Sequence, residues 1–313
     1  MGRPLVSIIG AGQVGATTAH LVVLKRLADV VLIDVVEGLA RGKALDLLQA
    51  AAIENVEIRV TGTTDYAALA GSRVVVVTAG LARKPGMSRE DLLNSNAAIV
   101  GPIAESIARF APDATVIVVT NPLDVMTALT LQRSGFSPNR VMGMAGILDS
   151  GRLCAFVAER LKGHPEQVRA MILGSHGDAM VPIRSAITVG GKPLATQLPA
   201  LEIDQLLTRT RDGGAEIVAL LKQSSAFYAP ASGVTQMIQA ILRDTHDTLP
   251  VCAWLTGQYG LRDVCIGVPA ELGASGIVRI VEIPLTDDER RALHQAAGQV
   301  SAGIKHLAAA TVR

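Results

Sequence analysis

The chain has 313 residues, a formal net charge of +1 and 49% hydrophobic residues. Such a length can bury a large core and favours two lobes over one, while the balanced charge argues against nucleic acid or an acidic membrane as a partner. The three cysteines, Cys154, Cys252 and Cys265, are too few and too scattered for a disulfide framework or a zinc site. We therefore expect a globular cytoplasmic protein with reduced thiols and no bound metal.

An uncharged stretch runs from Leu5 to Leu24 and is long enough to span a bilayer. Polar residues and three glycines interrupt it, and Lys25 and Arg26 follow it where a signal peptide would have its cleavage site. We expect neither a membrane span nor a signal peptide here.

The first half of the chain alternates short β-branched runs with stretches of helical character. The runs are 6–9, 30–33, 56–60, 74–77 and 116–119, and the helical stretches between them include Thr17–Leu27, Leu39–Ala52 and Asn94–Phe110. Apart from Ser7, all runs except 56–60 are continuously apolar, as in parallel strands that are buried on both faces. The alternation predicts βαβ units and a doubly wound parallel sheet of the α/β class.

Beyond about Met144 the rhythm changes to a mixture of helices and strands. We expect helices at Leu148–Leu161, Ile203–Lys222, Val234–Arg243 and from Asp287 onward, and strands near Val168–Leu173, Leu249–Leu255 and Val264–Val268. This α+β half is expected to form a second lobe that shares one cleft with the first. The predicted domains are residues 1–145 and residues 146–313.

A glycine motif, Gly10-Ala11-Gly12-Gln13-Val14-Gly15, follows the first predicted strand and opens a helix. Glycines at this spacing allow a tight turn and close approach of the backbone to a pyrophosphate, which the helix N-terminus stabilises. The second strand ends in Asp34, nineteen residues after Gly15, where an acid can bind the ribose hydroxyls. Because Asp34 would repel a 2′-phosphate and Val35-Val36 supply no arginine, the pattern favours NAD over NADP.

Three further segments supply polar groups at the ends of predicted elements: Thr120-Asn121-Pro122, Leu148–Arg152 and Gly174–Asp178. A hydride transfer to or from a 2-hydroxy acid needs a proton-exchanging group, which histidine suits, and a carboxylate-binding group, which arginine suits. His176 follows a strand, and Asp149 and Arg152 lie one helical turn apart. Taken alone, His176 is as consistent with a structural role as with a catalytic one. Asp149 and Arg152 are equally consistent with a helix cap and a surface ion pair.

Together these segments resemble, in order and spacing across the whole chain, the motif set of the lactate and malate dehydrogenases. The motifs are Ile9–Gly15, Asp34, Leu81–Arg89, Thr120–Pro122, Leu148–Arg152 and Gly174–Asp178. The resemblance implies a Rossmann NAD-binding domain followed by a C-terminal α+β substrate domain. It also implies an NAD-dependent oxidoreductase that acts on a small 2-hydroxy acid.

The same resemblance implies a role for each matching residue. His176 would be the acid/base, Asp149 would bind its far ring nitrogen and stabilise the imidazolium, and Arg152 would bind the C1 carboxylate of the substrate. Arg89 would polarise the reacting carbonyl from a closing loop of about 81–92, and Asn121 would bind the substrate oxygen. The implied cofactor-binding residues are Gly10, Gly12, Gln13, Val14, Gly15, Asp34, Thr78, Ala79, Gly80, Asn96, Thr120 and Asn121.

The position of Arg83 sorts substrates in this family, since lactate dehydrogenases carry glutamine there and malate dehydrogenases carry arginine. Oxaloacetate offers the guanidinium a second carboxylate, whereas pyruvate would leave an enclosed charge unpaired at a cost of about 3–5 kcal/mol. Arg83 therefore indicates the malate branch, a dicarboxylate substrate and a place in the tricarboxylic acid cycle. The alternative is a lactate dehydrogenase or a broader 2-ketoacid reductase on the same scaffold.

The segment Asp34–Leu47 also resembles the malate branch, in which the corresponding helix packs against a second subunit. We expect a homo-oligomer, with a tetramer favoured over a dimer. One segment departs from the pattern, because Ile183–Ala186 stands where that branch usually continues with Pro-Arg-Tyr.

Two other classes of protein share parts of the pattern. NAD- and metal-dependent glycosidases resemble the first domain but use a cysteine beside the asparagine that ends the corresponding strand, and here Thr120 precedes Asn121. A non-catalytic NAD-binding protein would lack some of the four residues His176, Asp149, Arg152 and Arg89, and all four are present. An enzyme is the favoured interpretation.

Overall fold

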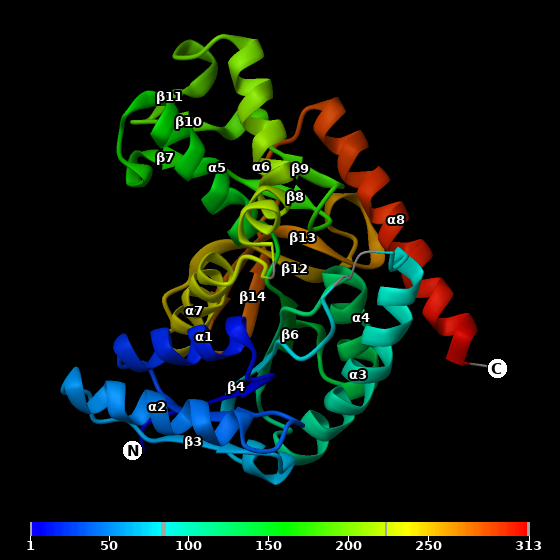
Figure 1. Ribbon diagram of the computed structural model, residues 1–313. Coiled ribbons are helices and arrows are strands. Elements are labelled where there is room, and N and C mark those ends of the chain that lie inside the picture. Colours follow the sequence, from blue (N-terminus) through cyan, green and yellow to red (C-terminus); the bar gives the residue numbers. More distant parts are fainter. Residues whose placement is uncertain (1, 83–85, 223, 312–313) are drawn as a thin grey trace.

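A computed structural model describes residues 2–82, 86–222 and 224–311 (Figure 1). Its first half contains six parallel strands in the order β3-β2-β1-β4-β5-β6. They are β1 (Leu5–Ile9), β2 (Asp29–Ile33), β3 (Val60–Thr63), β4 (Ser72–Val77), β5 (Thr115–Val118) and β6 (Val141–Gly143). The order reverses between β2 and β4, on either side of β1, so the predicted doubly wound sheet is confirmed.

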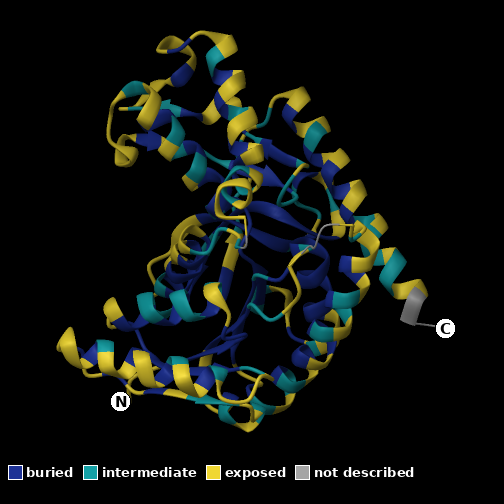
Figure 2. Cartoon of the chain, viewed as in Figure 1, coloured by how far each residue is buried: buried dark blue, intermediate teal, exposed yellow. Residues whose placement is uncertain are grey.

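Helices cover both faces of this sheet. Figure 1 shows α1 (Gln13–Leu24), α2 (Leu39–Ile53) and α7 (Tyr228–Arg243) on one face, and α3 (Arg89–Phe110), α4 (Leu123–Ser134) and α8 (Asp287–Thr311) on the other. Because both faces are covered, the strands between them are almost entirely buried (Figure 2). Within the described residues, no helix combines the length and the apolar character that crossing a membrane requires.

The strands of the second half extend the first sheet. A long antiparallel hairpin, β12 (Asp247–Thr256) and β13 (Arg262–Gly273), pairs with β6 on one side and leads to β8 (Ile172–Gly174) and β9 (Met180–Pro182) on the other; β14 (Gly276–Ile280) also pairs with β13. The remaining strands, β7 (Val168–Arg169), β10 (Thr188–Val189) and β11 (Lys192–Pro193), form a small sheet near α5 (Gly146–Leu161) and α6 (Ala200–Leu221). The predicted α+β character is confirmed, with most of its strands on the sheet of the first half and three on the small sheet.

Six short 3₁₀ helices complete the described secondary structure. They are η1 (Tyr66–Leu69), η2 (Pro138–Arg140), η3 (Pro165–Gln167), η4 (Arg184–Ala186), η5 (Leu194–Thr196) and η6 (Gln258–Gly260). Within the departing segment, Ser185 of η4 donates its backbone N–H and its hydroxyl to the carboxylate of Glu289 on α8, each at 3.1 Å. The unusual sequence therefore ties this surface to the C-terminal helix.

The prediction of a strand at 56–60 was wrong for all but its last residue. The backbone N–H and the side-chain Nε of Arg59 donate to the Asp29 carboxylate at 3.1 and 2.9 Å, while Val56 donates back to Ala51 at the end of α2. The chain therefore crosses the beginning of β2, and the ladder starts only at Val60. Val56 and Ile58 are buried, which explains the apolar pattern without a strand.

Candidate functional site

The carboxyl ends of four neighbouring strands meet where the strand order reverses. β1 leads to the glycine motif, β2 to Asp34, β4 to Thr78–Gly80, and β5 to Thr120 and Asn121. Ligands of open α/β sheets bind in the crevice outside such a reversal point. The fold thus brings the predicted cofactor residues from 10–34 to within reach of those from 78–121.

The three glycines of the motif meet different surroundings. Gly10 has a φ of +105°, and a Cβ there would lie 2.6 Å from the backbone nitrogen of Ala79, while a Cβ on Gly15 would lie 1.9 Å from the carbonyl oxygen of Gly10. These two positions require close backbone packing. Gly12 precedes α1, and a Cβ there would meet nothing within 4 Å. Open space at a helix N-terminus whose first turn has no acidic residue suits a phosphate.

Asp34 lies between the glycine motif and a neighbouring cavity. Its carboxylate accepts the backbone N–H of Ala11 at 2.7 Å and that of Val36 at 2.9 Å, so it also fixes the glycine loop. The cavity has a volume of about 590 Å³ and is lined by the motif, Asp34, Thr78–Gly80 and apolar residues of α3. No lysine or arginine among the described residues lines it. The residues present fit the adenosine half of NAD and offer a 2′-phosphate no cation.

Polar side chains connect the ends of β1, β4 and β5. Thr78 Oγ1 donates to the carbonyl of Gly10 at 2.9 Å, and Thr120 Oγ1 donates to that of Ala79 at 2.6 Å. Asn96 is fully buried; its Nδ2 donates to the carbonyl of Asn121 at 2.6 Å. These three side chains therefore fix the backbone of the crevice, and a direct contact of Asn96 with a cofactor stays a prediction.

One buried carboxylate joins the two principal candidates for the chemistry. Asp149, on the first turn of α5, is 1% exposed. Its Oδ2 lies 2.9 Å from Nδ1 of His176, and its Oδ1 accepts from Nη1 of Arg152 at 3.2 Å. Burial by itself lowers the pKa of His176, but the charge and hydrogen bond of Asp149, together with a smaller effect of Asp124, raise this pKa above the ordinary histidine value. The geometry holds the imidazole with its Nε2 as the remaining site for proton exchange.

Arg152 lies against α6 at a pair of adjacent glycines. A Cβ on Gly213 would approach Cδ of Arg152 to 3.3 Å, and one on Gly214 would lie 3.7 Å from Nη2. In the described part of the chain, Arg152 makes no hydrogen bond except the one to Asp149, and its Nε is buried without a partner. A guanidinium in this state has unused donors for an anion.

A cavity of about 500 Å³ brings these groups together with the sheet edge. Its lining includes Val14, Thr78, Gly80, Thr120, Asn121, Arg152 and His176. It shares Thr78 and Gly80 with the cavity beside Asp34, so the two are neighbours along the crevice. A dinucleotide that extends from the cavity beside Asp34 would reach the cavity that contains His176 and Arg152.

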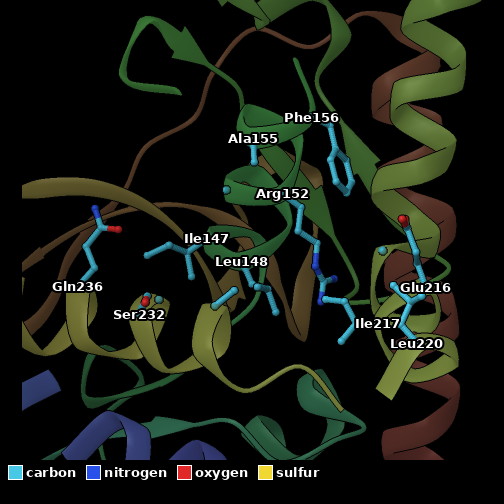
Figure 3. A pocket seen from close by; sticks show the side chains of 14 residues that line it. Ile147, Leu148, Arg152, Ala155, Phe156, Glu216, Ile217, Leu220, Ser232 and Gln236 are labelled. Atoms are coloured by element: carbon cyan, nitrogen blue, oxygen red, sulfur yellow. The ribbon is translucent and has the colours of Figure 1, made fainter. Parts of the chain in front are cut away.

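On its other side, Arg152 borders a more apolar cavity of about 480 Å³. Figure 3 shows the arginine extending from α5 between Leu148 of the same helix and Ile217 of α6, with Phe156 and Glu216 above. The side chain thus stands between this space and the cavity that contains His176. Apolar packing along its stem leaves the guanidinium as the polar end of the side chain.

Of the two arginines assigned to the predicted loop, Arg83 and Arg89, the structure describes Arg89. Arg89 is the first residue of α3, behind a capping box of Ser88 and Asp91, and forms an exposed ion pair with Asp178. It lines a third cavity, of about 480 Å³, together with Asn121 and His176, and not the cavity of Arg152. Arg83 lies outside the described residues.

Sequence reasoning missed several residues that hold the site. Asp124, next to the Asn121-Pro122 step, binds Ser175 and His176, and the glycine pair of α6 makes room for Arg152. The signals were present: a carboxylate early in a helix of otherwise apolar first turn, and two glycines inside a helical stretch, where each costs about 1 kcal/mol relative to alanine. Neither feature of the sequence shows which residues it will contact, because those contacts depend on the fold.

Comparison with known families covers nearly the whole chain. Residues 5–143 match the lactate/malate dehydrogenase NAD-binding domain, and residues 147–311 match the lactate/malate dehydrogenase α/β C-terminal domain. A malate dehydrogenase of Methanosarcina mazei is 48% identical over 96% of this chain and 98% of its own length. One of Desulforudis audaxviator is 50% identical over 98% and 99%.

Solved structures of both branches match the fold. A malate dehydrogenase of Cryptosporidium parvum has a TM-score of 0.96 and 40% identity, covering 98% of this chain and 100% of its own. A lactate dehydrogenase of the same organism, complexed with lactic acid and NAD, has a TM-score of 0.95 and 37% identity, covering 98% of each chain. On the sequence matches and the shared fold, this chain belongs to the lactate/malate dehydrogenase family.

Proposed function

We propose that the protein is an NAD-dependent malate dehydrogenase, which transfers a hydride reversibly between (S)-malate and NAD to give oxaloacetate and NADH. The single observation behind this proposal is the Asp149 carboxylate shared by His176 and Arg152 in a cavity next to the glycine motif. That arrangement offers a proton carrier and an anion receptor at the end of a dinucleotide crevice. The curated relatives reported above bear the name malate dehydrogenase.

Binding and proton transfer follow from the chain's own groups. Arg152 binds the C1 carboxylate of malate with the donors that Asp149 leaves unused. Asp149 holds the imidazole through Nδ1, so Nε2 of His176 accepts the proton of the C2 hydroxyl, and in the reverse direction returns it to the carbonyl oxygen. When bound in the crevice, NAD would supply the acceptor for the hydride of C2. Asn121 binds the substrate oxygen at the sheet edge.

Arg89 acts after a rearrangement. In the structure its guanidinium is paired with Asp178, and both residues line a cavity that includes His176 but not Arg152. To polarise the reacting carbonyl it leaves Asp178 and turns towards the cavity of Arg152. An exposed ion pair contributes only about 0–1 kcal/mol, so a bound substrate can outcompete Asp178 for the guanidinium.

Substrate choice within the family rests on Arg83. The near-equal TM-scores of the malate and lactate dehydrogenase structures mean that backbone fold does not separate the two activities. A guanidinium at position 83 pairs with the second carboxylate of oxaloacetate and lacks a partner when pyruvate is bound.

The first experiment compares the rate at which NADH absorbance falls with oxaloacetate and with pyruvate at equal concentrations. Strong preference for oxaloacetate supports the proposal. Preference for pyruvate would make the protein a lactate dehydrogenase, and no turnover of either substrate would contradict an enzymatic function of this class.

Replacing Arg83 with glutamine tests the selectivity directly. We expect Arg83→Gln to lower the ratio of kcat/KM for oxaloacetate over pyruvate by about 10²–10³-fold, because an unpaired enclosed charge costs about 3–5 kcal/mol. The matched control is Lys84→Gln, which removes a neighbouring charge and should leave the ratio unchanged. A ratio that is equal in Arg83→Gln and the wild type would show that another residue discriminates.

We further propose two domains, residues 1–145 for NAD and 146–313 for substrate, a cytoplasmic role in the tricarboxylic acid cycle, and a homotetramer in preference to a dimer. Exposed apolar side chains support self-association: Leu45, Leu48 and Ile53 on α2, with Leu220, Leu221 and Tyr228 at the ends of α6 and α7.

Light scattering of the purified protein should give the mass of a tetramer, and Leu48→Glu should lower that mass, because the substitution would bury a charge in the interface. Glu54→Gln, at the end of the same helix, is the control. A monomeric wild type would contradict the oligomer.

A further inference from the structure

A second buried carboxylate lies behind the histidine, on a different element from Asp149. Asp124 belongs to the first turn of α4 and is 3% exposed. Its Oδ2 accepts the hydroxyl of Ser175 at 2.6 Å and the backbone N–H of His176 at 3.2 Å. His176 is therefore held at two points: its ring by Asp149 of α5, and its main chain by Asp124 of α4.

The segment around His176 needs such a restraint. Gly174 and Gly177, on either side of Ser175 and His176, have φ values of +82° and +109°. Glycine in this region has wide conformational freedom, and a Cβ on Gly177 would meet nothing within 4 Å. Hydrogen bonds to Asp124 thus hold the side chain of Ser175 and the backbone of His176 between the glycines, in addition to the contact of the His176 ring with Asp149. A shift of about 1 Å in a reacting group can lower a rate by about 100-fold.

The surroundings of Asp124 favour an uncharged carboxyl group. Its Oδ1 is buried and has no nitrogen or oxygen partner among the described residues, and the fully buried thiol of Cys252 on β12 lies beside it. Burial raises the pKa of Asp124 against the opposing effects of Ser175, Cys252 and His176. Burial also raises the pKa of Cys252 well above its ordinary value, next to Cys265 on β13. The titratable or charged groups that face His176 are Asp149, Asp124 and Arg152.

We propose that Asp124 is a positioning residue for hydride transfer, which acts as a hydrogen-bond acceptor to Ser175 and to the backbone of His176 and so places the imidazole over the substrate. This role rests on the proposed function, because it requires His176 to exchange a proton with the substrate. Asp124 itself does not touch substrate or cofactor; it acts through His176.

Two substitutions separate acceptance of hydrogen bonds from charge. Asp124→Asn keeps an acceptor oxygen of the same reach and removes the ability to ionise, whereas Asp124→Ala leaves the N–H of His176 and the hydroxyl of Ser175 without their acceptor. We expect Asp124→Ala to lower kcat by about 10- to 100-fold, as for loss of a buried acceptor. Asp124→Asn should restore kcat to within about threefold of the wild type and leave the acid limb of the malate-oxidation profile in place.

Further variants protect the test against a folding defect. Ser175→Ala removes one of the two donors and should lower kcat by less than Asp124→Ala does. Thr130→Ala, on the same helix, removes a buried hydroxyl that, among the described residues, bonds to the Met126 carbonyl of α4 alone, and should leave kcat unchanged. NADH affinity, measured by fluorescence, should be equal in all variants because the cofactor groove is untouched.

Each outcome decides one question. A wild type that does not oxidise malate removes the proposed function, whatever the variants do. With an active wild type, the positioning role is overturned if folded Asp124→Ala keeps full kcat, or if Asp124→Asn loses as much as Asp124→Ala. A shift of the acid limb to lower pH in Asp124→Asn would also overturn it, since the carboxylate would then act on His176 by charge.

Discussion

His176→Asn is expected to lower malate turnover by about 10²–10⁴-fold, the usual contribution of a positioned acid/base. Asparagine approximates the size of histidine and can still donate to Asp149, but its amide does not titrate, so the C2 hydroxyl proton has no acceptor. NADH affinity should remain nearly unchanged, because the glycine motif and Asp34 are formed by other strands. Stopped-flow measurement of the first turnover, with NADH titration alongside, checks both parts.

The matched control for this substitution is His164→Asn. His164 is an exposed residue that precedes η3, and it lines none of the three cavities along the crevice. Its replacement should leave both turnover and cofactor affinity unchanged. Retained turnover in His176→Asn would remove His176 from the chemistry.

Asp149→Asn is expected to have the second large effect, about 10²–10⁴-fold on kcat, as when the carboxylate of a triad is replaced by an amide. Asp149 raises the pKa of His176 above its ordinary value against the opposing effect of burial. Without that negative charge, burial and Arg152 lower this pKa. Arg152 also loses the negative charge of its one hydrogen-bond partner in the described structure.

The direction of the pH effect follows from the proton balance. Malate oxidation needs a neutral Nε2 and fails as the pH falls through the pKa of His176, so the acid limb of its profile should move to lower pH in Asp149→Asn. Oxaloacetate reduction needs the imidazolium, so its alkaline limb should move to lower pH as well. Profiles of kcat in both directions measure this. The control is Glu159→Gln. Glu159 lies on α5, as Asp149 does, and forms an exposed ion pair with Arg209 of α6. An acid limb that stays in place would mean that Asp149 does not stabilise the imidazolium.

The parts of the fold that could be predicted are those encoded by local pattern. The glycine motif, the first two apolar runs (6–9 and 30–33) and Asp34 lie within the first 34 residues, and each has a direct physical reason for its spacing. By contrast, α4 was not predicted. Its buried Thr127 and Thr130 donate to carbonyls one turn back within the helix, so residues that look polar in sequence lie in the core.

Long-range pairing set the limit for the site itself. His176, Arg152 and the pairing of Asp149 with His176 followed from the family motifs. The structure adds that α5 lies beside β8 and that the same carboxylate also accepts a hydrogen bond from Arg152. The partner of Arg89 was equally out of reach, because Asp178 lies 89 positions further along the chain. A sequence gives residue types and local spacing, whereas contacts across the sheet depend on how distant elements pack.

Because His176 and Arg152 share the carboxylate of Asp149, the proton affinity of the histidine and the anion affinity of the arginine depend on each other. The positive charge of Arg152 disfavours the imidazolium of His176, and a carboxylate bound to that guanidinium offsets this charge. Binding of the keto acid therefore draws a proton from solvent onto the histidine. By reciprocity, protonation of the histidine tightens the grip on the keto acid to the same extent. The enzyme that is loaded for reduction thus already holds the proton that reduction consumes, and release of that proton accompanies departure of an unreacted oxaloacetate.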